Sequence, residues 1–312
     1  MHFLRVQTLE RVSDIEGYYS WGLFSSGFEK RSSHVAAAID QRVLRGRVAL
    51  GFAEGKDLLS RPDNDRIFNE TLNIPVVNPD ATGYEAFLLT ELDKLLTAGS
   101  NEKVSILIDY SVMTRAWYGL ILNWARFANH NQPIEFDFVY AYGKYLSEFD
   151  PLSISDIIAL PGYEGISAGL RNTVAVFGLG FDKYATLAVY DRLEPDSVIC
   201  CVAENPDNDT SASKAIQEND VLCDVAGRVI RLPLGDLESA FAILSDNIAS
   251  QELTSHIVVV PMGPKPHVLV SLLIALRLPR VTCLHAQGTR ERPVQVEAEG
   301  PISVARVTFV PK

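Results

Sequence analysis

Phe24-Ser-Ser-Gly27-Phe28-Glu29-Lys30 recurs in the chain as Phe177-Gly-Leu-Gly180-Phe181-Asp182-Lys183, and both stretches end in Gly-Phe-acid-Lys. Gly27 and Gly180 lie 153 residues apart, which is close to half of the 312-residue chain. A solenoid repeat recurs every ~20–50 residues, so the wider spacing found here indicates a duplicated domain. The chain length also fits about two domains of ~100–200 residues each.

Short apolar runs alternate with segments of helical composition around each stretch. In the first copy we expect strands over residues 21–25, 47–53, 74–77, 104–108 and 134–140, and helices over 31–43, 84–97 and 116–128. In the second copy we expect strands over residues 173–177, 197–203, 229–232, 256–260 and 280–285, and helices over 184–193, 236–248 and 268–278. Continuous apolar strands that alternate with helices indicate a mostly parallel sheet covered on both faces.

The shared order of elements predicts an α/β fold of two tandem Rossmann-like three-layer domains related by internal duplication. We expect these domains at residues 1–145 and 171–290, joined by a linker over 146–170. Residues 291–312 lie outside the repeat, and alternation on both sides of Glu299-Gly300-Pro301 predicts a C-terminal β-hairpin.

Two local interpretations complete the expected fold. The polar residues 54–73 are interpreted as a loop, and residues 204–220 of the second copy are polar as well. Glu135 and Asp137 are interpreted as the exposed face of a strand.

The net charge of −11 limits the partners that we expect. Surfaces that bind bulk nucleic acid or membranes gather Lys and Arg, so neither partner is expected, whereas a small anionic ligand needs only a few local cations. Residues 1–19 contain no apolar core of a signal peptide, and no apolar run approaches the ~20 residues that span a bilayer. The four cysteines form no CxxC pair and are interpreted as reduced thiols, so we expect a cytoplasmic protein.

Ligands of open α/β sheets bind beyond the carboxyl ends of the strands, where the strand order reverses. In each copy this places the loop after the first strand beside the loop after the fourth. Both loops run into helix N-termini, whose N–H groups and dipole favour an anion. The candidate ligand-binding residues are Gly27, Glu29, Lys30, Arg31, Ser111, Thr114 and Arg115 in the first copy, and Gly180, Asp182, Lys183, Gly263, Lys265 and His267 in the second.

Asp109 follows the fourth strand of the first copy directly and is the candidate catalytic residue. A carboxylate at this place would position a hydroxyl or a water, but its counterpart in the second copy is Pro261, which confines the role to the first copy. Other interpretations stay open for the remaining candidates. Gly27 and Gly180 also suit tight turns without a ligand, and His267 also suits an exposed position at a helix start.

Several catalytic and cofactor signatures are absent from the sequence. Gly178-Leu-Gly180 is a fragment of GxGxxG, with Lys183 in place of the last glycine, so a standard NAD site is disfavoured. The sequence contains no HExxH motif, EF-hand loop or zinc-ligand spacing, and no GxSxG motif. We therefore expect neither a metal site nor a resident cofactor.

Val174-Ala-Val-Phe177 with Gly180, followed by a helix and Leu193-Glu-Pro-Asp-Ser-Val-Ile, resembles the first strand, loop, helix and second strand of CARF-like Rossmann sensor domains. Val258-Val-Val-Pro-Met-Gly263-Pro-Lys265 resembles their Gly-Thr-Lys-type ligand loop. Over residues 18–290 the chain is similar to SAVED domains, which consist of two fused CARF-like units. This resemblance implies recognition of a cyclic oligonucleotide or a similar nucleotide signal in bacterial antiviral defence.

Three hypotheses for the function follow. The leading one is a sensor or regulatory protein that binds a nucleotide or another phosphate ligand. The second is an enzyme that acts on a nucleotide or sugar-phosphate, with Asp109 as base and Lys265, Arg115 or Lys30 holding phosphate. The third is a degenerate scaffold or partner subunit of a larger defence complex. The expected partners are thus a small anionic ligand of the nucleotide class and a protein partner or a second copy of the chain.

Overall fold

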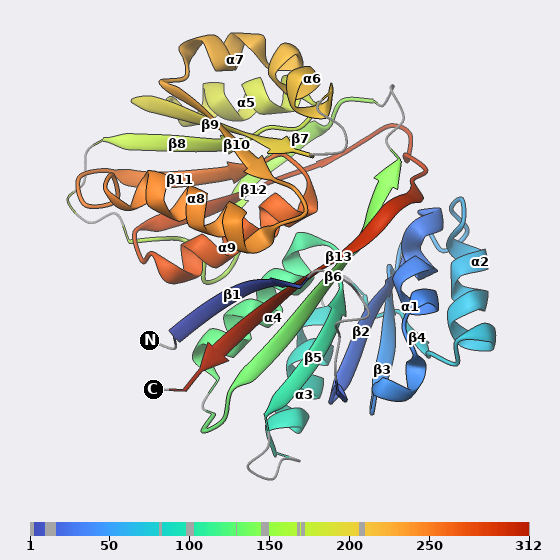
Figure 1. The fold of residues 1–312 in the computed structure, drawn as a ribbon. Coiled ribbons are helices and arrows are strands. Elements are labelled where there is room, and N and C mark those ends of the chain that lie inside the picture. Colours follow the sequence, from blue (N-terminus) through green and yellow to red (C-terminus); the bar gives the residue numbers. More distant parts are fainter. Residues whose placement is uncertain are drawn as a thin grey trace. The chain divides into compact units, whose positions relative to one another are not determined.

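The computed structural model describes residues 3–9, 17–80, 83–97, 103–128, 130–144, 150–166, 169, 172–205 and 210–311. The chain divides into two compact units: unit 1 consists of Met1–Glu148 and Val294–Lys312, and unit 2 consists of Phe149–Pro293. Each unit contains one sheet with helices on both of its faces (Figure 1). The last strand of the chain therefore belongs to the same unit as the first.

Seven strands form the sheet of unit 1 in the order β1-β13-β6-β5-β2-β3-β4. Strands β2 to β6 run parallel, and β13 and β1 extend the sheet in antiparallel pairing. The strand order reverses at β2, which lies between β3 and β5. The strands are β1 (Phe3–Leu9), β2 (Trp21–Ser26), β3 (Arg47–Gly51), β4 (Val76–Val77), β5 (Val104–Asp109), β6 (Ile134–Lys144) and β13 (Glu297–Val310).

Helices pack on the two faces of this sheet. On one face, Val35 and Ala36 of α1 share a buried apolar cluster with Phe24, Leu107 and Val139 of the sheet. On the other face, α3 and α4 pack against each other (Figure 1). The helices of unit 1 are η2 (Lys30–Ser33), α1 (His34–Ala38), η3 (Gln41–Val43), α2 (Arg61–Arg66), the π-helix η4 (Ile67–Thr71), α3 (Gly83–Thr97) and α4 (Arg115–Phe127).

Unit 2 repeats this plan with six strands in the order β10-β9-β8-β11-β12-β7. All pairs are parallel except β12 with β7. The strands are β7 (Ser153–Ala159), β8 (Thr173–Gly178), β9 (Ser197–Glu204), β10 (Arg228–Pro233), β11 (His256–Pro261) and β12 (Val281–Thr289). The helices are α5 (Lys183–Leu193), α6 (Thr210–Glu218), α7 (Asp220–Val225), α8 (Leu237–Ala249) and α9 (Lys265–Arg277).

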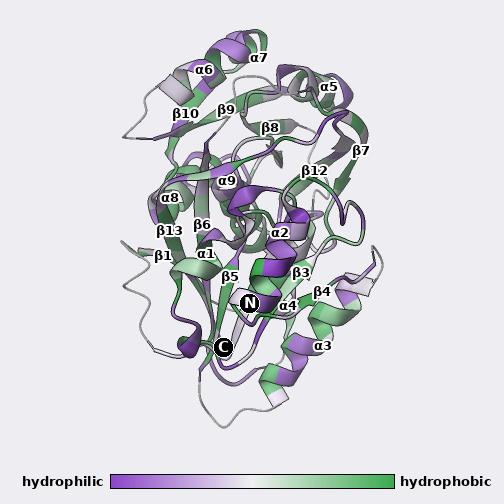
Figure 2. Ribbon diagram, turned by 90° about the vertical axis from the view of Figure 1, so that its right-hand side faces the viewer, coloured by the Kyte–Doolittle hydropathy of each residue, from purple (hydrophilic) through white to green (hydrophobic). Residues whose placement is uncertain are grey.

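The two units share the strand order that defines the fold class. β8 lies between β9 and β11 in unit 2, just as β2 lies between β3 and β5 in unit 1. The prediction of an α/β fold with two Rossmann-like, mostly parallel sheets is therefore confirmed. Figure 2 shows the difference in hydropathy between a core strand and a surface helix: β5 is drawn in the green of hydrophobic residues, whereas much of α2 is purple.

The predicted C-terminal hairpin is wrong. Residues 297–310 form one 14-residue strand, β13, which pairs with β6 and β1. The register shifts between Ala298 and Ile302, and Gly300 has a positive φ of 80°. Gly300-Pro301 thus produces a local irregularity rather than a chain reversal, because the alternation on its two sides belongs to the same strand.

The expected linker and loops also contain regular structure. β7 lies inside the segment predicted as a linker, and its backbone pairs with β12. Helices α2, α6 and α7 lie in or overlap the two polar segments, because short helices that bury at most two apolar side chains lack the apolar run that marks a core helix. The helix expected over 31–43 is broken at Asp40, whose carboxylate accepts the backbone N–H of Arg42.

Glu135 and Asp137 are buried, contrary to the exposed face that we predicted for them. Asp137 on β6 faces Arg306 on β13 and accepts two guanidinium hydrogen bonds of 2.8 Å. Tyr19 donates its hydroxyl to the same carboxylate. β13 therefore covers these acids, and its Arg306 pairs with Asp137. The hairpin interpretation did not place β13 next to β6, so it gave no reason to expect these acids to be buried.

No helix in the described ranges is both long and apolar enough to cross a membrane.

Candidate functional site

Side chains fix the loop after β2 in unit 1. The Gly27 N–H donates to Ser32 Oγ at 2.9 Å, and this hydroxyl donates to the Ser25 carbonyl at 2.6 Å. The amide nitrogen of Asn64, on α2, donates to the carbonyls of Gly27 and Glu29, each at 2.8 Å. These bonds suit the alternative interpretation of Gly27 as a tight turn.

Four candidate residues of unit 1 meet around Ala141 of β6. Arg31 donates from Nε to Glu29 at 2.7 Å and from Nη1 to the Ala141 carbonyl at 2.8 Å. The Ala141 N–H donates to Ser111 Oγ at 2.9 Å, and that hydroxyl donates to Asp109 at 2.6 Å. The loops after the first and fourth strands therefore lie side by side, as the strand order predicts.

Asp109 closes the turn that follows β5. Its Oδ1 accepts the Ser111 backbone N–H at 3.0 Å as well as the Ser111 hydroxyl, and the residue is only 1% exposed. A carboxylate that is sealed from solvent and bound to its own loop holds that loop in shape. The geometry thus gives Asp109 a structural role in this conformation.

Arg31 is buried rather than presented to solvent. Its guanidinium lies 5.4 Å from the centre of the Tyr140 ring and donates to the Tyr140 hydroxyl at 3.3 Å. Burial acts to lower the pKa of Arg31, but the neighbouring Tyr140 and Glu29 outweigh it and raise that pKa. Arg31 therefore stabilises unit 1 from within as a permanently charged group.

The two lysines of the repeated motif lie in different surroundings. Lys30 forms an ion pair with Glu297 of β13 at 2.5 Å, and both side chains are more than half exposed. Lys183 lies with its Nζ 5.4 Å from the ring centre of Tyr184. The motif is thus repeated in sequence but not in its contacts.

The loops of unit 2 touch through their backbones. A Cβ placed on Gly180 would lie 2.6 Å from the Met262 carbonyl oxygen, and one on Gly263 would lie 2.8 Å from the Leu179 carbonyl oxygen. The Met262 N–H donates to the Gly178 carbonyl at 2.8 Å. Both glycines are therefore required by close backbone approach.

Asp182 caps the helix that follows β8. Its carboxylate accepts the N–H groups of Ala185 at 3.2 Å and Leu152 at 2.8 Å, and it pairs with Arg290 at 3.0 Å. The positive end of α5 is therefore already matched by an acid of the chain itself.

His267 is buried in the first turn of α9, which rules out the exposed position considered for it. Its Nε2 lies 3.4 Å from the Pro233 carbonyl oxygen. Burial lowers the pKa of His267 to about 4, so the imidazole is neutral at pH 7. In this conformation the ring is packed inside unit 2 rather than placed to meet an anion.

Helices α4 and α9, which follow the fourth strand in each unit, begin in the same way. The N-cap residues Thr114 and Pro264 form no side-chain cap hydrogen bond, and neither helix has an acid in its first turn. The first helical residue is a cation in both cases, Arg115 and Lys265. A cation at this end opposes the helix dipole, so the arrangement costs stability and favours an external anion.

Aromatic side chains hold the start of α4 in place. Trp117, in its first turn, stacks on Phe52 at the end of β3 with ring centres 4.9 Å apart. Tyr84, in the first turn of α3, lies 6.0 Å from the same indole. The N-terminus of α4 is therefore positioned firmly beside the carboxyl ends of the strands.

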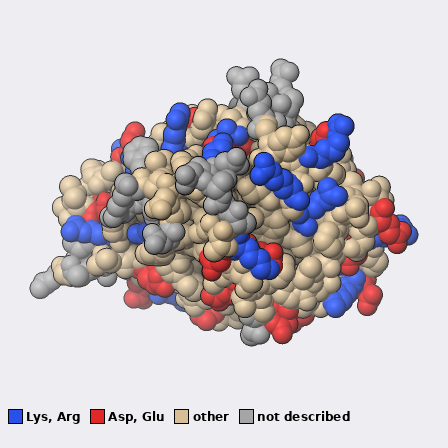
Figure 3. All heavy atoms as spheres, turned by 90° about the horizontal axis from the view of Figure 1, so that it is seen from below, with Lys and Arg blue, Asp and Glu red and all other residues tan. Residues whose placement is uncertain are grey.

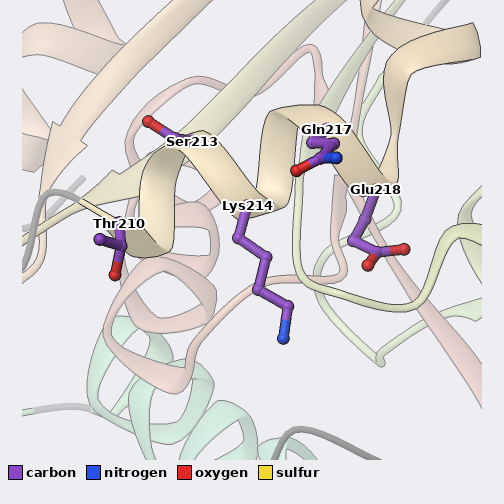
Figure 4. A pocket seen from close by; sticks show the side chains of 5 residues that line it. All are labelled: Thr210, Ser213, Lys214, Gln217 and Glu218. Atoms are coloured by element: carbon purple, nitrogen blue, oxygen red, sulfur yellow. The ribbon is translucent and has the colours of Figure 1, made fainter.

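Two surface hollows lie in unit 2. One, of about 250 Å³, is lined by Lys183, Tyr184, Leu187 and residues 218–222 of the α6–α7 junction. The other, of about 480 Å³, runs along α6, where Lys214 and Glu218 point to the same side (Figure 4). Both hollows are lined by side chains of both charges, which does not suit selective binding of an anion.

Figure 3 shows basic and acidic side chains interspersed over the face that it draws. Over the described ranges, no group of His, Cys, Asp and Glu residues is suited to hold a metal ion. The four cysteines are reduced thiols, and burial raises the pKa of Cys200, Cys201 and Cys223. These three thiols are therefore not activated for chemistry in this structure.

Sequence reasoning missed the residues that clamp and surround the loops. Asn64 and Asn219 both donate to the glycine carbonyl of the first loop, Gly27 and Gly180, at 2.8 Å. The two asparagines lie 155 residues apart, which is close to the spacing of the two glycines. A search for further pairs at this spacing could therefore have found them. Ser26 and Arg61, at the same sheet edge, had no signal of this kind.

The chain matches no model of a known protein family and no curated protein.

Proposed function

We propose that this protein is a sensor or regulatory protein that binds nucleotide phosphate at the N-terminus of α4 in unit 1 and, as a separate site, at the N-terminus of α9 in unit 2. The observation that carries the proposal is the shared start of these two helices: a cation as first residue, no side-chain cap and no acid in the first turn. Both helices follow the fourth strand, beside the point where strand order reverses and where ligands of such folds bind.

Other helices of the same chain provide the contrast. α5 and α8 each begin with an aspartate whose carboxylate accepts a first-turn N–H group, and α3 has Glu85 in its first turn. These acids satisfy the positive helix ends internally. α4 and α9 have no such acid in their first turns. In this proposal a ligand phosphate supplies the negative charge there.

The resemblance to CARF-like and SAVED domains supports a cyclic oligonucleotide as the nucleotide, and bacterial antiviral defence as the setting. The reduced thiols support a cytoplasmic location. In this proposal Asp109 is a structural residue, so binding rather than turnover is the primary activity.

Thermal unfolding in the presence of ATP, cyclic di-AMP and cyclic tetra-adenylate tests this proposal. A ligand at 100 times its Kd stabilises the native state by about 2.7 kcal/mol, which raises Tm by several degrees. We expect at least one of these nucleotides to produce such a rise. Unchanged Tm values with all of them would contradict the proposal.

Matched variants then locate the site. Arg115→Ala and Lys265→Ala should each weaken nucleotide binding at least tenfold. Arg42→Ala and Lys94→Ala remove the same charges from exposed ion pairs elsewhere in unit 1 and should leave binding unchanged. Equal affinities in all four variants would place the ligand away from α4 and α9.

A further inference from the structure

Arg61 is a buried charge at the carboxyl ends of β3 and β4. It is 1% exposed, and its guanidinium donates to the Phe52 carbonyl at 2.9 Å and to the side-chain oxygen of Asn78. Gly51 makes room for it, because a Cβ there would collide with the guanidinium. Apolar residues often replace a buried ion pair without loss of stability, so stability alone does not account for this arginine.

One carboxylate oxygen of Asp65 occupies the centre of this arrangement. Arg61 Nε donates to Asp65 Oδ1 at 2.7 Å, and the Ser26 hydroxyl donates to the same oxygen at 2.5 Å. Ser26 is the last residue of β2, the strand at which the strand order reverses. A guanidinium and a hydroxyl that converge on one anionic oxygen form a donor set suited to a phosphate oxygen.

Asp65 and Arg61 differ in their access to solvent. The Asp65 side chain is 29% exposed, whereas that of Arg61 is 1% exposed. An anion from solvent therefore reaches the guanidinium by taking the place of the Asp65 carboxylate.

The segment that carries Asp65 is bounded by two residues with left-handed backbone, Leu59 (φ 48°) and Asn73 (φ 52°). Such conformations in residues other than glycine concentrate at ligand clamps and switches. The backbone conformations of Leu59 and Asn73 are thus consistent with a segment that changes position when a ligand binds.

Unit 2 lacks the corresponding donor. The residue 153 positions after Ser26 is Leu179, which is buried in the apolar cluster of unit 2. Duplication of the loop therefore did not produce this arrangement, and it belongs to unit 1 alone.

We propose that Ser26 and Arg61 form an anion site for a ligand phosphate group, which Asp65 occupies until the phosphate displaces it. None of these residues belongs to α4 or α9, so the inference goes beyond the proposed function. The displaced carboxylate is already partly exposed and moves into solvent. The site thus links phosphate binding to release of the segment that carries Asp65.

Titration with inorganic pyrophosphate tests this inference without a nucleotide. Asp65→Ala removes the internal competitor and should tighten pyrophosphate binding at least tenfold. Asp63→Ala is the matched control, because it removes an acid from the same helix that pairs with Arg66 at 2.8 Å on the surface. We expect the control to change the affinity less than twofold.

Two further variants complete the test. Ser26→Ala in the Asp65→Ala background should reverse most of the gain, since it removes one donor to the phosphate. Should Asp65→Ala fail to fold, Asp65→Asn keeps an oxygen acceptor for Arg61 and should tighten binding at least threefold. Equal affinities of the Asp65 and Asp63 variants, or no pyrophosphate binding to any variant, would overturn the inference. These outcomes do not depend on Arg115 or Lys265, whose variants decide the proposed function separately.

Discussion

The loop after β2 and the loop after β8 share a motif and a place in the fold, but different forces hold them. In unit 1 the Ser32 hydroxyl holds the loop, because it accepts the Gly27 N–H and donates to the Ser25 carbonyl. In unit 2 the backbones of Gly180 and Gly263 press against the facing loop. Glu29 pairs with a buried arginine, whereas its counterpart Asp182 caps a helix. Duplication thus preserved the topology while the acid of the motif acquired two roles.

The comparison also shows what both units kept. In each, an asparagine from the segment after the second strand donates to the glycine carbonyl of the first loop. In each, the helix after the fourth strand starts with a cation and no side-chain cap. The first feature holds the loop in shape, and the second is the basis of the proposed phosphate binding.

Substitution of the two motif glycines by alanine should give the largest difference in stability loss between the two units. Gly180→Ala places its Cβ 2.6 Å from a backbone oxygen, so the backbone must shift, and we expect a loss of about 3 kcal/mol. The nearest atom to a Cβ on Gly27 is a ring carbon of Phe52 at 3.3 Å, and we expect a loss below about 1 kcal/mol there. Chemical denaturation measures both values, and equal losses would contradict the two modes of loop packing.

Acid should destabilise the protein through His267. Its pKa is lowered to about 4 in the folded state, so the unfolded state binds more protons between pH 6.5 and 4. Stability is therefore fully present above about pH 6.5 and falls as the pH drops, with a loss of about 2 kcal/mol by pH 4.5.

His267→Gln provides the control for this pH dependence. The variant should be less stable at pH 7 but should lose less stability on acidification. Denaturation curves from pH 7 to 4.5 compare the two proteins. A parallel decline in both would remove His267 as the cause.

Removal of the two asparagine clamps should have similar but unequal effects. Asn64→Ala leaves the carbonyls of Gly27 and Glu29 without this donor, and we expect a loss of about 2 kcal/mol. Asn219→Ala also removes a buried side-chain oxygen for which no hydrogen bond is found, so its loss should be smaller, about 1 kcal/mol. Thermal unfolding of the two variants should rank them in this order, and the reverse order would contradict the assignment.

Exchange of the helix caps should give the smallest effects, with opposite signs. Asp182→Thr removes the acid at the start of α5 and should destabilise by about 1 kcal/mol. Thr114→Asp supplies an acid at the start of α4 and should stabilise by about 0.5 kcal/mol while weakening nucleotide binding. Equal nucleotide affinities of Thr114→Asp and the unaltered protein would argue against α4 as a phosphate site.

Strand order and element type were predictable because each core strand is a continuous apolar run. The segments that were predicted wrongly are those whose local hydropathy pattern does not show which strands or loops they pair with in the fold. β13 alternates like a hairpin arm on both sides of Gly300, and only its pairing with β6 shows that it is one strand. α2 has no apolar stripe, since its stability comes from Arg61 and Asn64 bound to the sheet edge.

The candidate site was predictable in place but not in detail. Strand order indicated that Arg31 and Asp109 lie near each other, which the hydrogen bonds through Ala141 confirm. It could not show that both are buried, because burial depends on β6 and β13 from distant parts of the sequence. Ser26 and Asp65 meet for the same reason across 39 residues.

Amide chemical shifts on addition of nucleotide test the central claim most directly. In ¹⁵N–¹H spectra at saturating cyclic tetra-adenylate or ATP, the first-turn amides of Arg115, Ala116 and Lys265 should move most. The Ala185 amide, which is bound by the Asp182 carboxylate, should stay in place as the internal control. Shifts at Ala185 with none at Arg115 or Lys265, or no shifts at all, would contradict the assignment of phosphate to the uncapped helices.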